Sequence, residues 1–113
     1  PIEDEGDRTG YIRIEGVIDS PNLNTDENQL RVHFKSQGTR GQRLTTYIIA
    51  SRAMKLLKGK YFGQNAWSRL LGSRDDGGIV SAFCYPNGFL YVIRRLHPRV
   101  RGPYWGGRSE EVL

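Results

Sequence analysis

Ten lysine and arginine residues, and no aspartate or glutamate, lie between Arg31 and Arg74. The members of this acid-free stretch are Arg31, Lys35, Arg40, Arg43, Arg52, Lys55, Lys58, Lys60, Arg69 and Arg74. Basic residues on an ordinary surface are interleaved with acids that form local ion pairs. The complete absence of acids predicts a surface that meets negative charge, and nucleic acid is the commonest partner of that kind.

A predicted β-hairpin over residues 79–96 carries the second set of residues that could do chemistry. A type I turn with Pro86 at its second position and a left-handed Gly88 suits this segment, because a two-residue Asn-Gly turn would need an N–H that proline lacks. The resulting three-residue loop with a G1 bulge pairs Tyr85 with Phe89, Cys84 with Leu90 and Phe83 with Tyr91. This register places Val80, Ala82, Cys84, Leu90 and Val92 on one face and Phe83, Tyr85, Phe89, Tyr91 and Ile93 on the other.

Two interpretations of the aromatic hairpin face are open. The rings form either the core beneath the helices or an exposed platform on which bases stack, with Arg94 and Arg95 beside it. An exposed platform would bind nucleic acid with strong salt dependence, because arginine and lysine neutralise phosphates and release counterions.

The two histidines support a catalytic alternative. His33 lies on a predicted basic strand and His97 follows the hairpin, so they could act as general base and acid in metal-independent RNA cleavage. Asp75 and Asp76 indicate a turn rather than a metal site, because adjacent carboxylates in a glycine-rich segment point to opposite sides. The only cysteine, Cys84, excludes an internal disulfide framework and a cysteine-based zinc site. We expect a non-catalytic protein without metal or cofactor, and keep this small endoribonuclease as the alternative.

Two strands and a basic loop must position the first half of the acid-free stretch. Alternating apolar residues predict a strand from Tyr11 to Ile18 and another from Gln29 to Ser36, with Arg31, His33 and Lys35 on the outward face of the second. The loop at residues 37–42 contains two glycines around Arg40 and is followed by Arg43. It is either a simple connection or a mobile basic finger whose backbone approaches a phosphate closely.

Two helices are predicted to follow the loop. Residues 45–58 form an amphipathic helix ended by Gly59, in which Ile49, Ala53, Leu56 and Leu57 gather on the inward side and Arg52, Lys55 and Lys58 nearly opposite. A shorter helix is predicted over residues 64–71, with Trp67 in the core, and a turn over residues 73–78.

These elements predict an α+β fold with one small domain over residues 10–97. Its antiparallel sheet consists of two N-terminal strands and the C-terminal hairpin, packed on two short central helices. Residues 1–9 are predicted to be a disordered acidic N-terminus, since the first thirty residues hold eight acids although the net charge of the chain is +5. Residues 98–113 are predicted to be an extended tail of arginine, glycine and aromatic residues.

The pattern as a whole predicts a nucleic-acid-binding domain, for DNA or RNA. The expected contact residues are Arg31, Lys35, Arg40, Arg43, Arg52, Lys55, Lys58, Lys60, Arg69, Tyr91, Arg94 and Arg95. In one geometry the order helix, turn, helix, hairpin resembles the layout of a winged-helix domain and places Gln64, Asn65, Ser68 and Arg69 in a DNA groove. In the other, a curved sheet grips a single strand on its open face. A protein-interaction module for an acidic partner is the remaining alternative.

Hydropathy and cysteine content predict an intracellular protein with no membrane partner. The longest apolar runs are five residues or fewer, and nothing resembles a signal peptide.

Overall fold

Two β-sheets and two helices make up the parts of the chain that the computed structural model describes, residues 2–5, 11–63 and 65–113. The larger sheet has the strand order β1 (Ile2–Asp4), β4 (Trp67–Asp75), β5 (Gly78–Cys84) and β6 (Leu90–Ile93), and β7 (Trp105–Gly107) pairs with β4. The smaller sheet has the order β2 (Ile12–Ile14), β8 (Ser109–Val112) and β3 (Arg40–Gly41). All pairings are antiparallel except that of β4 with β7. The predicted α+β class is confirmed.

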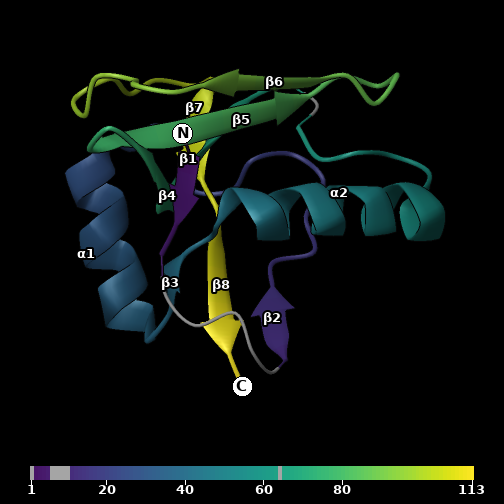
Figure 1. Ribbon diagram of the computed structural model, residues 1–113, viewed down its shortest axis with the longest axis horizontal. Helices are drawn as coiled ribbons and strands as arrows, with labels where there is room; N and C mark the ends of the chain where they lie inside the picture. Colours follow the sequence, from purple (N-terminus) through teal and green to yellow (C-terminus); the bar gives the residue numbers. More distant parts are fainter. Residues whose placement is uncertain (1, 6–10, 64) are drawn as a thin grey trace.

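The larger sheet separates the two helices, α1 (Glu27–Gln37) and α2 (Leu44–Lys58) (Figure 1). Leu70 and Leu71 are adjacent in β4, so their side chains point to opposite faces of the sheet. Leu70 packs with Tyr47 and Ala50 of α2, whereas Leu71 packs with Leu30 and Phe34 of α1. The core is therefore divided in two by the sheet, and β4 is buried on both faces.

The hairpin formed by β5 and β6 agrees with the sequence prediction. Phe83 pairs with Tyr91 and Cys84 with Leu90. The Tyr85 N–H donates to the Phe89 carbonyl at 2.9 Å, and Gly88 has a left-handed backbone with φ of 90°. The three-residue loop, its bulge and the resulting register are thus confirmed, because the turn chemistry of Pro86 and Gly88 is local.

Helix α1 replaces the strand predicted from Gln29 to Ser36. Leu30 and Phe34 are buried, but Val32 between them is exposed. The two buried apolar residues are therefore four positions apart and lie on one face of the helix. Asp26 and Gln29 form a reciprocal capping box at the start of α1, and left-handed Gly38 ends it. The strand prediction was wrong because two buried positions four residues apart lie on one face in a strand, which has a period of 2, and also in a helix, which has a period of 3.6. The other N-terminal strand, predicted from Tyr11 to Ile18, is confirmed only for the three residues of β2.

Helix α2 ends at Gly59, as predicted, but its predicted orientation is wrong. Tyr47, Ala50 and Ser51 are buried, whereas Ile49 and Leu56 on the opposite side are exposed. The aliphatic stripe of α2 therefore faces outward.

Strand β4 occupies most of the segment predicted as a second helix. Its residues show little alternation because both faces are covered, which removes the period that identifies a strand. The turn predicted over residues 73–78 is reduced to Asp76 and Gly77, which both have positive φ between β4 and β5.

The predicted disordered N-terminus and the predicted extended C-terminal tail both contribute strands. At the N-terminus, Ile2–Asp4 pairs with β4, and the Glu5 N–H donates to the Gly72 carbonyl. The other residues of the predicted N-terminal tail lie outside the described part of the chain. In the predicted C-terminal tail, β7 and β8 join the two sheets to one another. A Cβ on Gly107 would lie 2.5 Å from Leu30 Cδ1, so the glycine allows close packing here rather than flexibility.

Arg108, between β7 and β8, is completely buried. Its guanidinium lies 3.7 Å from the centre of the Phe62 ring, and Nη2 donates to the carbonyls of Ile18 and Asp19. Burial lowers the pKa of Arg108 to about 10, partly opposed by the Tyr47 hydroxyl and by acids nearby. This arginine ties the C-terminal segment to the core.

Candidate nucleic-acid interface

A continuous row of aromatic rings crosses the larger sheet on the face opposite α2. It contains Trp105 of β7, Trp67 of β4, Phe83 of β5, Tyr91 of β6, and Tyr85 and Phe89 beside the hairpin turn. Neighbouring ring centres are 5.1–5.9 Å apart, so each ring contacts the next. We call these six residues the aromatic row.

The hairpin end of the aromatic row is open to solvent. Tyr85 is 44% exposed, Phe89 58% and Tyr91 46%. The alternate residues of β5, among them Ala82 and Cys84, are buried beneath α2. These three hairpin rings are therefore exposed and do not form the core beneath the helices, whereas base stacking on them stays a prediction.

The two tryptophans extend the aromatic row beyond the hairpin. Trp67 and Trp105 are register partners in the parallel pair of β4 and β7, and both are half-buried. Trp67 was predicted to lie on the core side of a helix and Trp105 in an extended tail, so neither was predicted as part of a site. Their pairing depends on a contact between distant parts of the chain, for which the local sequence carries no signal.

Exposed arginines follow the same strands and the segment before β7. Arg94 and Arg95 come directly after β6, at the end away from the hairpin turn, and lie 3.5–3.8 Å from the carboxylates of Asp75 and Asp76. Arg99 and Arg101 are exposed in the segment that leads to Trp105, together with Tyr104. The sequence predicted the first pair as contact residues but not the second.

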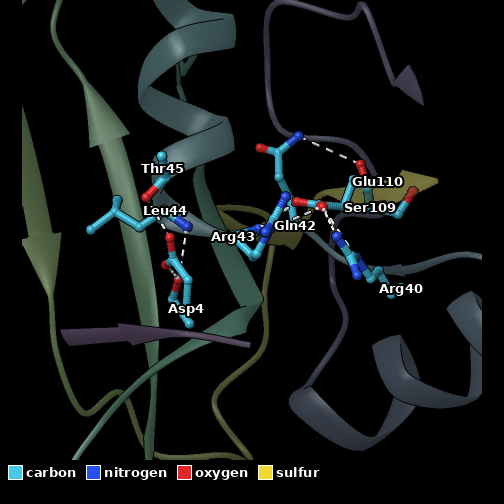
Figure 2. A network of polar contacts seen from close by, with 9 residues as sticks. Asp4, Arg40, Gln42, Arg43, Leu44, Thr45, Ser109 and Glu110 are labelled. Carbon is cyan, nitrogen blue, oxygen red and sulfur yellow. Dashed lines mark hydrogen bonds and ion pairs between the residues drawn. The ribbon is translucent and has the colours of Figure 1, made fainter. Parts of the chain in front are cut away.

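Arg40 and Arg43 are turned toward a buried carboxylate, as Figure 2 shows. Glu110 of β8 accepts from Arg40 Nη2 at 2.7 Å, from Arg43 Nε at 3.1 Å and from the Arg43 backbone N–H at 2.8 Å. Arg43 is buried. The loop is therefore not a mobile basic finger, and Arg43 is wrong as a nucleic-acid contact because the fold covers it.

Asp4 lies at the edge of this network and joins β1 to the start of α2. It accepts hydrogen bonds from the hydroxyls of Thr45 and Ser73, and the Ser73 hydroxyl accepts from the Leu44 N–H at 2.8 Å (Figure 2). The network explains why α2 starts at Leu44 without a side-chain cap from Arg43.

Arg69 is also wrong as a contact residue. Only 1% of the residue is exposed, and its guanidinium donates to the carbonyls of Thr25, His97 and Val100. The arginine holds two loops against β4. The winged-helix geometry fails with it, because Arg69 and Ser68 are buried in a strand rather than presented on a helix.

The other predicted basic residues are exposed but lie on two separate helices. Arg31 and Lys35 are on α1, where Arg31 pairs with Glu27 at 2.8 Å. Arg52, Lys55 and Lys58 are on α2, and Lys60 follows that helix. Since α1 and α2 pack on opposite faces of the sheet, the acid-free stretch does not gather on one face of it.

The predicted catalytic histidines lie in different elements. His33 is exposed on α1, and His97 is exposed after β6, where its Nδ1 accepts from the Arg99 N–H at 3.2 Å. No contact between the two imidazoles occurs in the described structure, so their pairing stays a prediction. No group of histidine, cysteine and carboxylate side chains suited to a metal ion occurs among the described residues.

Comparisons of the chain with protein-family models, curated proteins and solved structures give no match. Within the described ranges, neither helix is long and apolar enough to cross a bilayer.

Proposed function

We propose that this protein binds single-stranded nucleic acid along the aromatic row. The observation that carries the proposal is the exposure of Tyr85, Phe89 and Tyr91 on the sheet face opposite α2. Contacts between neighbouring exposed rings stabilise a sheet only modestly, whereas unpaired bases gain by stacking on such rings.

Stacking on the aromatic row supplies the affinity that does not depend on charge. Each stacked base contributes about 1–3 kcal/mol, and sheets that present a few aromatic side chains hold two or three bases. The bases of a duplex are already stacked on one another, so the aromatic row favours single strands over duplexes.

Arginines at the borders of the aromatic row supply the phosphate contacts. Arg94 and Arg95 lie along the line of β6, and Arg99 and Arg101 precede Trp105. Each neutralised phosphate lowers the slope of log K against log salt by about 0.7 on a single strand. Two to four such contacts therefore predict a slope between about −1.4 and −2.8.

Fluorescence anisotropy with labelled oligo(dT), oligo(U) and a duplex tests the proposal across a salt series. Tyr91→Ala and Phe89→Ala should each weaken single-strand binding by about fivefold or more, since each removes one stacking partner. Tyr91→Phe should retain binding because it keeps the ring. Tyr11→Ala is the matched control, since Tyr11 is exposed and lies next to β2 in the smaller sheet.

Two results would reject the proposal. The first is the absence of oligonucleotide binding at low salt. The second is oligonucleotide binding that neither Tyr91→Ala nor Phe89→Ala weakens, because the affinity would then come from charge alone.

A further inference from the structure

The outward side of α2 carries an aliphatic stripe that no described part of the chain covers. Ile49 is 65% exposed, Leu56 88% and Leu57 77%, and the partly buried Ala53 lies between them on the same side. We call these four residues the α2 outer face. Exposed leucines of this extent, grouped on one helix, indicate an interaction surface.

The α2 outer face is not a loosely packed part of the core. Tyr47, Ala50 and Ser51 hold the other side of the helix against the sheet, and the Ser51 hydroxyl accepts from the Phe62 N–H at 2.9 Å. Rotating the helix to bury the leucines would expose these residues. The outward stripe is therefore a fixed part of the fold.

Arg52 and Lys55 lie beside Leu56 at the border of the α2 outer face, and we call these two residues the basic flank. Lys55 donates to the Gly59 carbonyl at 3.1 Å and lies over the Tyr61 ring. In the described structure neither residue of the basic flank forms an ion pair. Their charge is available to a partner.

We propose that the α2 outer face docks an acidic amphipathic helix of a partner protein. Ile49, Ala53 and Leu56 are separated by four and then three residues, which is the spacing of a helix–helix seam. Ala53 at the middle of the seam lets a second helix approach closely. Acids that flank the apolar stripe of the partner would meet the basic flank, so the charges of the two surfaces are complementary.

The same charges disfavour two other occupants. A second copy of this chain would bring one basic flank against another, and like charges at an interface are costly. An anionic lipid surface would match the charge, but lipid tails impose no four-three spacing and give no reason for a small residue at the centre of the stripe. Both occupants remain measurable outcomes of the experiment.

The test measures binding of a labelled peptide of about three heptads, which has leucine at the a and d positions and glutamate at the e and g positions. We expect the peptide to bind the full chain, and Leu56→Ser combined with Leu57→Ser to weaken binding about tenfold or more. Both leucines are exposed, so the double variant should fold. Val32→Ser is the matched control, because Val32 is an exposed aliphatic residue on α1.

Charge and register are tested with two further peptides. A peptide with lysine in place of glutamate should bind the chain at least about tenfold more weakly, and Arg52→Glu with Lys55→Glu should reverse that preference. A peptide of the same composition, scrambled so that the leucines form no stripe, should not bind. Equal binding of the scrambled and ordered peptides would overturn the proposal, because charge alone would then explain the affinity.

Vesicles and light scattering decide between occupants. Leucine-dependent binding to phosphatidylserine vesicles without peptide binding would replace the proposal with a membrane surface. A leucine-dependent dimer without peptide binding would replace it with a second copy. Oligonucleotide binding by the aromatic row is a separate readout, since Tyr91→Ala should leave peptide binding unchanged.

Discussion

Trp67 and Trp105 lie side by side on the sheet face opposite α2, with ring centres 5.9 Å apart and register pairing between parallel strands. They are the only two tryptophans in the chain. Both belong to the aromatic row, so the intrinsic tryptophan emission of the protein comes from its proposed binding surface alone.

This relationship predicts that oligonucleotide binding quenches tryptophan fluorescence. Oligo(dT) should quench emission saturably, with a midpoint that moves to higher concentration as salt rises. A polyanion without bases, such as heparin, should give little quenching at equal charge. Equal quenching by heparin would mean that the rings are not in contact with bases.

Glu110→Gln should destabilise the fold by about 3–5 kcal/mol in urea unfolding. The substitution removes the buried negative charge that accepts from Arg40 and from the buried Arg43, so it breaks a buried ion pair. Glu111→Gln is the adjacent control, because its pair with Arg13 is exposed at 3.5 Å and should contribute less than about 1 kcal/mol. Similar losses in both variants would show that burial of Glu110 is not what matters.

Arg69→Met should loosen the segment that leads to β7. Arg69 donates to the carbonyls of His97 and Val100, which the methionine would leave without that donor. We expect a loss of about 3 kcal/mol or more and faster tryptic cleavage at Arg99 and Arg101, since protease cuts the locally opened chain. Arg31→Met, on the surface of α1, should change neither measurement appreciably.

Tyr47 should make stability fall at alkaline pH. Burial raises the pKa of Tyr47 well above its ordinary value of about 10, so the native state keeps a proton that the unfolded state loses. The contribution of Tyr47 is complete below pH 10 and declines by about 1.4 kcal/mol per pH unit above it. The pKa of Arg108 is lowered to about 10, so deprotonation of Arg108 raises stability above that pH, opposite to the effect of Tyr47. The test therefore compares two proteins that both contain Arg108 and differ only at Tyr47.

Urea unfolding of the natural protein and of Tyr47→Phe between pH 7 and pH 11 measures that difference. At pH 7 the variant should be equally stable or slightly more stable, since the buried hydroxyl has no hydrogen-bond partner among the described residues. Above pH 10 the natural protein should lose stability relative to Tyr47→Phe. Tyr104→Phe is the control substitution, because it removes the hydroxyl of an exposed tyrosine.

Local chemistry explains which parts of the fold could be predicted. Pro86 and Gly88 define the hairpin turn and its register, and Gly59 defines the end of α2, because each acts on its own backbone. The capping box of Asp26 and Gln29 is an equally local signal for α1, but the sequence prediction did not use it.

Contacts between distant residues explain what could not be predicted. Strand β4 shows no alternation of apolar and polar residues because α1 and α2 cover its two faces. Strands β7 and β8 could not be predicted because they form by pairing with β4 and β2, which lie far away in the sequence. The site divides in the same way. The exposed hairpin rings follow from the register, whereas the burial of Arg43 and Arg69 depends on Glu110 and on carbonyls far along the sequence.

The position of β8 between β2 and β3 has a consequence for how the chain is made. During synthesis on a ribosome, α1 and α2 emerge well before Glu110, so the carboxylate that accepts from Arg40 and Arg43 is added only after both helices. The smaller sheet then forms in one late step, when β8 pairs with β2 and β3. Such non-local closure makes folding slow, and ribosome stalling before residue 109 would present a collapsed intermediate to chaperones rather than a native domain.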